Sequence, residues 1–372
     1  MRPIQTALLI QVFHSFASGI LGIALPIMMK ERQISVVTVG FVFAAMPIIF
    51  QLGRMLFATF SDFWGRKLFF ISSGFLAVAS GLIYHAAYAP LEYFFGKVVE
   101  GTKEGTLWAV NRAFLLEQGG GQLKALIRLR TVVYIAYAVG SFTAGYLIVW
   151  ILFEGTMLLC AAFGAAVVLV AMTLERGKKE EFDLSKALRF LDFRKKEKPF
   201  RRFFILFCMM GLSLGLIGGF VLAWYLDANG FNLEMIGLIL GAQVLLAGVF
   251  SHLFSRTTRT RQSILLSGVM FAITFLVLGF AGPFLVAALI VLYGAVQGIA
   301  SIGQEAIASK ISDKRSYGID IGLLWTGFHI TESLSLALTG IMISQWGFAA
   351  PFGLAALTYS IFAVGSYFSL SD

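Results

Sequence analysis

The chain has 372 residues, of which 58% are hydrophobic and only 13% are charged, and its formal net charge is +9. A soluble domain is typically about a quarter charged, so the composition indicates a protein that lies in a lipid bilayer and excludes a soluble enzyme. The surplus of Lys and Arg is typical of the cytoplasmic loops of membrane proteins, and we do not interpret it as a nucleic-acid-binding surface.

Twelve apolar stretches are long enough for a helix that crosses the bilayer, which needs about 20 residues. The predicted spans are 4–29, 36–60, 67–88, 91–116, 123–150 and 155–174, followed by 201–227, 233–255, 262–281, 283–309, 316–344 and 346–369. The predicted fold is therefore an all-α integral membrane protein, with twelve transmembrane helices in two pseudo-symmetric six-helix bundles, residues 1–174 and 201–372. A cytoplasmic linker, residues 175–200, joins them, and its Phe and Leu residues also permit a short helix at the membrane surface.

Gln11, His14 and Ser18 lie on one face of the first predicted span. A single His on an apolar helix is more often packed in a core than used as a ligand. These side chains therefore allow two interpretations, a packed core and a functional face.

A short polar junction, Ala58 to Lys67, separates the second span from the third. Its Asp, its Gly and its two adjacent cations cannot lie in hydrocarbon, and cations mark the cytoplasmic side of a membrane. With the amino terminus on the same side, only Lys30 and Arg32 are left outside. We therefore predict a multi-pass protein of the plasma membrane with both termini in the cytoplasm.

The junction resembles a signature of the major facilitator superfamily, in which the loop after the second transmembrane helix reads Gly-x-x-x-Asp-Arg-x-Gly-Arg-Lys. Ala58 replaces the first Gly and Phe63 the first Arg. The matching residues are Asp62, Gly65, Arg66 and Lys67. The two sets of six spans fit the same family. The resemblance implies a secondary transporter whose central site opens alternately to either side.

The resemblance also implies a gate at this junction. We predict that Asp62 docks at the amino end of the eleventh span, whose partial positive charge attracts a carboxylate. Arg66 would reach Asp320 or a nearby acid and tie the two halves together when the site opens outward.

The fourth predicted span holds the densest group of polar side chains. One arc of this helix carries Lys97, Glu100, Glu104, Trp108 and Asn111. A charge within a span costs ~2.5–3.5 kcal/mol on insertion scales, so such residues usually face a cavity or a partner. We expect Lys97 and Glu100, one helical turn apart, to form a pair.

Glu104 is left without an oppositely charged partner on its own arc, because Lys97 is expected to pair with Glu100 and Lys103 points about 100° away from Glu104. A buried carboxyl without a partner is protonated more readily than one in water. Glu104 and Glu100 are therefore candidates for proton coupling, and Lys97, Trp108 and Asn111 are candidates for the substrate cavity. An ion-pair network that only holds the helices together is the alternative.

The fifth predicted span resembles the Gly-x-x-x-Gly-Pro-x-x-Gly-Gly pattern of proton-coupled exporters. Gly140 and Gly145 are present, and Ser141 replaces the Pro. Small residues at this spacing also let membrane helices approach each other, so helix packing is an equally good explanation.

Polar residues return in the tenth and eleventh spans. Gln297 and Gln304 lie in the tenth, which the resemblance places around the cavity with the first, fourth and seventh. The resemblance therefore makes Gln11, His14, Gln297 and Gln304 candidates for a substrate cavity. The eleventh carries Trp325, a cavity candidate, with His329 and Glu332 on the same face. His329 and Glu332 are one turn apart and can share a proton, which makes them a second candidate for proton coupling. The alternative is a buried pair without a transport role, and two side chains on one helix are weak evidence for a metal.

The chain has no Walker phosphate loop, which excludes direct ATP drive by this chain alone, and we predict no enzyme activity, cofactor or metal. The predicted function is proton-coupled export of small amphipathic or drug-like molecules, in keeping with the Phe- and Met-rich spans. The alternative is proton-coupled uptake of a small polar or anionic solute such as a sugar or an organic acid. An intramembrane enzyme that uses His329 and Glu332, or a non-transporting sensor, are the interpretations from other classes. We expect a monomer whose partners are a small-molecule substrate, protons and lipid.

Overall fold

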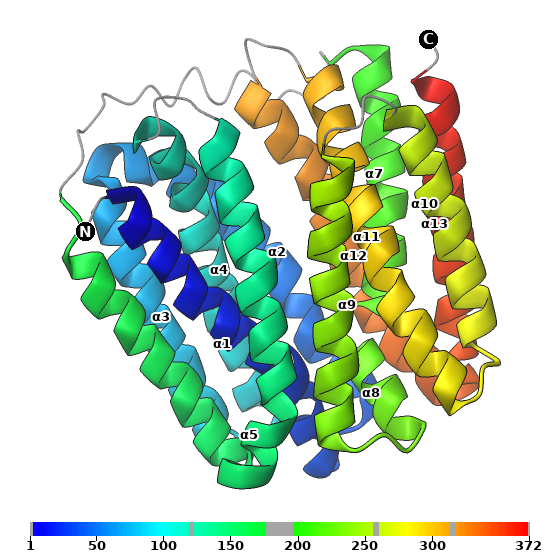
Figure 1. The fold of residues 1–372 in the computed structure, drawn as a ribbon, viewed down its shortest axis with the longest axis horizontal. Helices are drawn as coiled ribbons and strands as arrows, with labels where there is room; N and C mark the ends of the chain where they lie inside the picture. Colours follow the sequence, from blue (N-terminus) through cyan, green and yellow to red (C-terminus); the bar gives the residue numbers. More distant parts are fainter. Residues whose placement is uncertain (1–2, 119–122, 176–195, 256–259, 313–316, 371–372) are drawn as a thin grey trace.

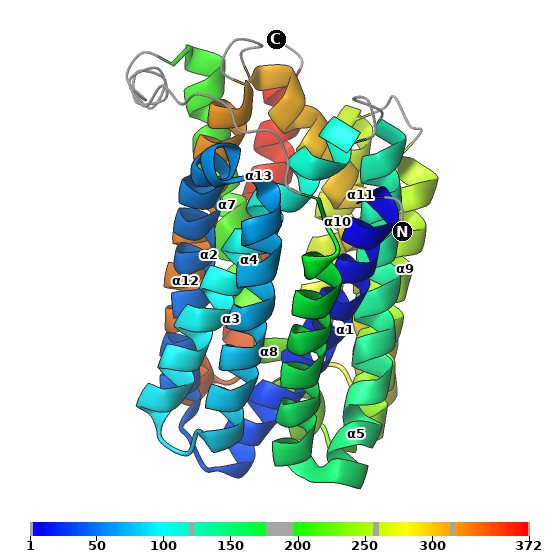
Figure 2. The ribbon, with the colours of Figure 1, turned by 90° about the vertical axis from the view of Figure 1, so that its left-hand side faces the viewer.

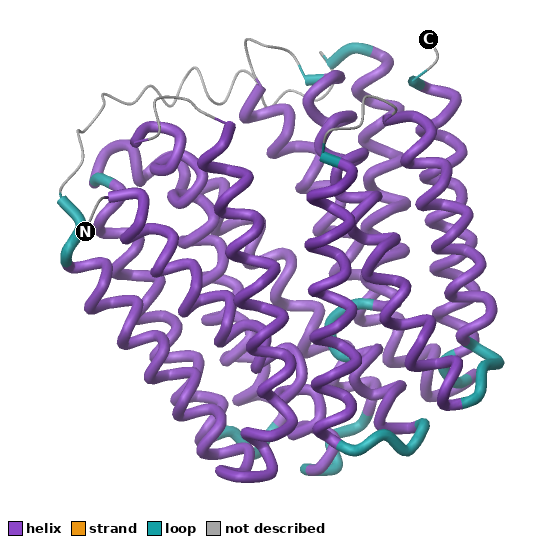
Figure 3. The backbone as a smooth tube through the Cα atoms, viewed as in Figure 1, coloured by secondary structure: helices purple, strands orange, loops and turns teal. Residues whose placement is uncertain are grey.

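The computed structural model describes residues 3–118, 123–175, 196–255, 260–312 and 317–370, and the elements that these residues form are all α-helices (Figures 1 and 3). The helices form two groups that stand side by side. The amino-terminal group consists of α1 (Pro3–Glu31), α2 (Val36–Trp64), α3 (Arg66–Ala86), α4 (Pro90–Gln118) and α5 (Leu123–Met172). The carboxyl-terminal group consists of α7 (Lys198–Ile217), α8 (Val221–Ala228), α9 (Leu233–Phe254), α10 (Thr260–Leu278), α11 (Pro283–Ile311), α12 (Tyr317–Trp346) and α13 (Ala349–Ser369).

Nine helical segments of the described chain are long and apolar enough to cross a membrane. One of them, Arg128–Met172, contains two crossings, because the chain turns back within α5 (Figure 2). The two long helices outside this set are α4 and α12, which carry the charged and polar side chains of the predicted sites. The described elements are thus consistent with the twelve predicted crossings.

Two predicted spans are joined in the structure, and one is broken. The spans 123–150 and 155–174 form the single element α5, which is bent by the non-helical backbone of Leu152 (φ 62°, ψ 176°). The span 201–227 is divided between α7 and α8. Gly219 lies between these two helices with a φ of 60°, a left-handed conformation that glycine adopts without a steric penalty.

The predicted linker is shorter than expected on its carboxyl-terminal side. α7 begins at Lys198, inside the stretch 175–200. Pro199 lies in the first turn of this helix, where a Pro is compatible with helical geometry. Residues 176–195, which include the alternative surface helix, lie outside the described residues.

The polar junction between α2 and α3 is a sharp turn. Gly65 has a φ of 85°, and its N–H donates to the carbonyl oxygen of Ser61 at 3.0 Å, so α2 ends there and α3 begins at the next residue. At the other end of α2, the side chain of Ser35 accepts a hydrogen bond from the backbone N–H of Thr38 at 3.2 Å, which is a standard amino-terminal cap. Local sequence therefore sets both ends of this helix.

The two groups of helices pack together mainly through α2 with α12 and through α5 with α9. The second contact is closest at Gly145, where an added Cβ would lie 2.1 Å from the carbonyl oxygen of Leu233. Gly140 makes a similar contact within its own half, since a Cβ there would lie 2.1 Å from the carbonyl oxygen of Phe16. Both glycines of the exporter-like pattern therefore have a packing role.

α1 begins and α13 ends at the same face of the molecule (Figure 1). At the opposite face, Trp224 of α8 donates from Nε1 to the carbonyl oxygen of Pro26 in α1 at 2.7 Å, and Lys30 of α1 pairs with Asp227 of α8. These contacts join the two halves at that face. The assignment of each face to a side of the membrane stays a prediction.

Candidate functional site

Glu104 of α4 is the centre of a buried polar cluster. His14 Nε2 lies 2.9 Å from its Oε2, and Trp108 Nε1 donates to the same oxygen at 3.1 Å. Ser18 Oγ donates to Oε1 at 3.1 Å, and Lys103 Nζ lies 3.0 Å from that oxygen. His14 and Ser18 belong to α1, so this carboxylate links α1 to α4.

The prediction that Glu104 lacks an oppositely charged partner was wrong. Lys103 is 2% exposed and its ammonium reaches back to Glu104. The helical angle predicts only the direction of the Cα–Cβ bond, and the four methylenes of a Lys side chain are long enough to turn toward the preceding or following position. Glu104 is thus held by several donors, and its role in carrying a proton stays a prediction.

The predicted pair of Lys97 and Glu100 is confirmed. Lys97 Nζ lies 2.8 Å from Glu100 Oε2, and both side chains are almost completely buried. The hydroxyl of Tyr84 in α3 donates to the same oxygen at 2.6 Å, and the Lys97 ammonium lies 4.2 Å from the ring centroid of Phe43 in α2. The pair therefore ties α4 to two neighbouring helices.

Gln11 and Asn111 contact each other between α1 and α4. Asn111 Nδ2 donates to Gln11 Oε1 at 2.6 Å, and Gln11 Nε2 donates to Ser15 at 2.8 Å. Both residues are completely buried. The hydrogen bond between Asn111 and Gln11 links α4 to α1.

His329 and Glu332 of α12 form the second predicted pair. His329 Nδ1 lies 2.7 Å from Glu332 Oε2. The imidazole is surrounded by aromatic rings, with Phe50 of α2 at 5.1 Å, Phe328 at 4.9 Å and Trp325 at 5.9 Å between ring centroids. The contact is confirmed, and its part in proton coupling stays a prediction.

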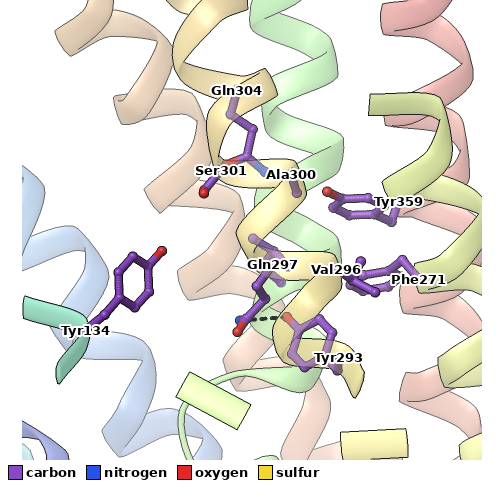
Figure 4. Close-up of a pocket in the computed structure, with 10 residues that line it drawn as sticks. Tyr134, Phe271, Tyr293, Val296, Gln297, Ala300, Ser301, Gln304 and Tyr359 are labelled. Carbon is purple, nitrogen blue, oxygen red and sulfur yellow. Dashed lines mark hydrogen bonds between the residues drawn. The ribbon is translucent and has the colours of Figure 1, made fainter. Parts of the chain in front are cut away.

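A cavity of about 220 Å³ lies along one side of α11 (Figure 4). Its walls come from α7, α10, α11 and α13 and, across the boundary between the halves, from α5. The lining residues are Tyr134, Leu214, Phe271, Tyr293, Val296, Gln297, Ala300, Ser301, Gln304 and Tyr359. None of these side chains is charged at neutral pH, so the cavity is aromatic and polar but electrically neutral.

Hydrogen bonds fix the orientation of Gln297 inside the cavity. Its Nε2 donates to the hydroxyl of Tyr293 at 3.0 Å, and its Oε1 accepts a hydrogen bond from Gln243 of α9. Figure 4 shows Tyr134 of α5 facing Gln297 and Ser301 from the opposite half. A ligand in this cavity would thus contact the Gln297 amide, whose orientation is fixed, and aromatic rings from both halves.

Two of the predicted cavity residues, Gln297 and Gln304, line this cavity. The others are not among its lining residues and are packed in the clusters described above or against aromatic rings: Lys97, Trp108, Asn111, Gln11, His14 and Trp325. The lining residues that the sequence did not indicate include four aromatic ones, Tyr134, Phe271, Tyr293 and Tyr359. Aromatic residues occur throughout the spans of this chain, and position in the sequence does not distinguish a cavity wall from a lipid-facing surface.

A profile of the Major Facilitator Superfamily matches residues 7–256 and 203–371, and so extends over both halves. The chain belongs to the major facilitator superfamily. It is thus a membrane transporter of small molecules, and the all-helical fold that was predicted is confirmed.

Solved structures with the same fold include the nucleoside transporter NupG. A point mutant of NupG aligns with a TM-score of 0.84 at 15% identity over 99% of both chains, and NupG itself aligns with a TM-score of 0.81 at 15% identity over all of both chains. At this identity the likeness shows the fold alone. None of the curated protein sequences matches the chain.

In this major facilitator protein, the cavity is adjacent to a bridge between the halves. Arg130 of α5 lies 3.2 Å from Glu305 of α11, and its guanidinium lies 5.9 Å from the ring centroid of Tyr134. Tyr134 also packs closely on α9. A Cβ added at Gly248 of α9 would lie 2.8 Å from the Cβ of Tyr134. The ion pair and the ring therefore connect α5, α9 and α11 beside the cavity.

The residues that were predicted to form a gate have contacts mostly within one half. Arg66 Nη2 lies 2.7 Å from Glu117 Oε1 of α4, and Lys67 donates to the carbonyl oxygen of Met172 at 2.6 Å. Arg66 was predicted to reach Asp320 or a nearby acid and tie the two halves together, whereas its described ion pair, with Glu117, lies within its own half. Asp320 pairs with Lys196, and the side chain of Asp62 lies outside the described residues.

Within the part of the chain that the structure describes, no three His, Cys, Asp or Glu side chains gather as possible metal ligands.

Proposed function

We propose that this transporter carries a small, neutral, polar solute of the nucleoside class into the cell, and that a proton gradient drives the movement. The observation that carries the proposal is the neutral lining of the cavity. The rings of Tyr134, Phe271 and Tyr359 offer flat apolar surfaces for a heterocyclic base. The amides of Gln297 and Gln304 each supply a donor and an acceptor for the edge of a base or the hydroxyls of a sugar.

The size and charge of the cavity favour this class over the alternatives. Sites for drug-sized ligands measure roughly 300–1,000 Å³, whereas this cavity measures about 220 Å³. An anionic solute would lack a counter-charge in its lining. The structural likeness to a nucleoside transporter supports the same class. Export of amphipathic compounds has weaker support, because Gly140 and Gly145 have packing roles.

Proton coupling would act through the polar cluster of the amino-terminal half. Addition of a proton to Glu104 would remove its charge and so weaken its bonds to Lys103 and His14. Because His14 belongs to α1, the protonation state of Glu104 would change how firmly α1 is held to α4. His329 and Glu332 offer a second proton site at the boundary with α2.

Uptake of radiolabelled uridine into proteoliposomes, with and without an imposed pH gradient, tests the proposal. We expect accumulation of uridine when the interior is alkaline, and competition by other nucleosides but not by organic acids. Gln297→Ala should reduce apparent affinity about tenfold or more through loss of its hydrogen bonds. Gln345→Ala, an exposed Gln at the end of α12 and outside the cavity, is the matched control. Transport of hydrophobic cations with no nucleoside transport or binding would refute the proposal.

A further inference from the structure

A second hollow lies away from the transport cavity, where the end of α11 meets the beginning of α10. Its volume is about 410 Å³. Thr260, Arg261 and Gln262 of the first turn of α10 form one wall, and Lys310 of the last turn of α11 forms another. Leu370, which directly follows the last residue of α13, also lines the hollow, so the hollow lies at the face where α13 ends (Figure 1).

Arg261 and Lys310 bring two positive charges to this hollow. Among the described residues, neither forms an ion pair with an Asp or a Glu. The Arg261 guanidinium lies 3.9 Å from the ring centroid of Tyr367, which holds it in place, and its Nε is buried without a hydrogen-bond acceptor. Buried donors in folded proteins almost always have an acceptor. A ligand that brings an acceptor into the hollow would supply the missing hydrogen bond to Arg261 Nε.

The position of Arg261 at a helix start also favours an anion. The first N–H groups of a helix have no partner within the helix and carry partial positive charge. A cation is normally disfavoured at this end, whereas Lys310 at the carboxyl end of α11 is in a favourable place. An anion between them would neutralise Arg261 and Lys310 and accept hydrogen bonds from the first N–H groups of α10.

The rest of the lining is apolar. Ile307 and Leu370 border the same hollow, so a charged group bound by the cations would lie beside a hydrocarbon surface. Basic hollows between transmembrane helices are sites at which anionic lipid headgroups bind. We propose that this hollow binds a phosphate group, carried either by an anionic phospholipid or by a free phosphate anion.

Thermal unfolding of the purified full-length protein in a neutral detergent tests the site. The probes are phosphatidylglycerol, inorganic phosphate and, as a zwitterionic reference, phosphatidylcholine. We expect phosphatidylglycerol or phosphate to raise the unfolding temperature in a saturable manner, because a ligand that binds only the folded state stabilises it. A response to the lipid alone assigns the site to a headgroup, and a response to both assigns it to the phosphate group itself.

The variant Arg261→Gln/Lys310→Gln should weaken this binding about thirtyfold, since each cation near a membrane surface contributes about fivefold to the binding of an anionic group. The control Lys198→Gln/Arg201→Gln removes two exposed cations from α7. If the first double variant fails to fold, Lys310→Gln alone, at an exposed position, should weaken binding about fivefold. No response to either anionic probe, or equal weakening in both double variants, would overturn the proposal. Because unfolding is measured without any transported solute, failure here is independent of the proposed transport function.

Discussion

The contacts of Glu104 show how a carboxylate is accommodated within a membrane helix. One oxygen faces Lys103 and Ser18, and the other faces His14 and Trp108. A charge in the bilayer core is costly unless donors surround it, and the four donors around Glu104 supply that environment. Because two of them belong to α1, a change at this single residue affects the contact between two helices.

Glu104→Gln should abolish gradient-driven uptake and leave solute exchange and binding measurable. A Gln side chain can still accept hydrogen bonds from its neighbours, but it does not gain or lose a proton at physiological pH. Uptake against a gradient and counterflow exchange, measured in the same proteoliposomes, separate the two effects. Glu92→Gln, at an exposed Glu of the same helix, is the control. Full uphill uptake by Glu104→Gln would transfer the coupling role to His329 and Glu332.

Lys97→Met and Glu100→Gln should each destabilise the protein by roughly 3–5 kcal/mol, because removal of one partner leaves a buried charge without compensation. The double variant should recover most of that stability. Unfolding in detergent measures the three variants, and uptake shows whether transport returns with stability. If both single variants are as stable as the wild type, the two side chains do not form an energetically coupled pair.

At the scale of the elements, α11 contributes both to the cavity and to the boundary between the halves. Gln297, Ser301 and Gln304 line the cavity, and the next residue, Glu305, pairs with Arg130 of α5. Residues three and four apart share a face of a helix, which brings the polar lining and the ion pair to the same side of α11. Tyr134, one turn after Arg130, then closes the cavity from the opposite half.

Arg130→Gln should open this side of the cavity. The probe is the thiol of Ser301→Cys in a background without Cys160 and Cys208. We expect this thiol to react several-fold faster with a water-soluble maleimide when Arg130 is replaced by Gln. The exchange Arg130→Glu/Glu305→Arg should restore the slower rate, because it rebuilds the pair. Arg32→Gln, which loses an ion pair within one half, is the control. An equal increase in that variant would argue against a gate at Arg130.

At the scale of the whole molecule, ion pairs account for the two cations that lie on the predicted outer side. Lys30 pairs with Asp227 across the two halves, and Arg32 lies 2.8 Å from Glu154 within the amino-terminal half. Arg32 also donates to the hydroxyl of Tyr93 at 2.6 Å. The exceptions to the cytoplasmic preference of Lys and Arg are thus side chains that hold loops and halves together.

Lys30→Gln should favour the conformation in which the face carrying α8 is open. The pair is partly exposed, with 39% and 26% of the two side chains accessible, so we expect a shift of up to about 1 kcal/mol, or roughly fivefold in population. Spin labels at Leu91→Cys and Phe280→Cys, one on each half, report the separation. Arg32→Gln breaks a pair within one half and should leave the distance distribution unchanged; the same distribution in Lys30→Gln would mean that the pair does not act as a latch.

The amino-acid sequence by itself determined the helices, their division into two halves and the local side-chain pairs. Hydrocarbon forces every backbone polar group to be satisfied within a helix, so an apolar stretch of sufficient length is enough to predict a span. The pairs of Lys97 with Glu100 and of His329 with Glu332 were predictable because one helical turn brings such residues together.

Only the tertiary structure decided which side chains meet across helices. His14 and Glu104 are 90 residues apart in the chain, and Arg130 meets Glu305 only because α5 and α11 lie on either side of the boundary between the halves. The cavity depends on Tyr134, Phe271, Tyr293 and Tyr359, which come from four helices. Hydropathy gives the same value to an aromatic residue that faces lipid and to one that faces a cavity, and the rotation of each helix about its axis, set by packing against its neighbours, distinguishes the two.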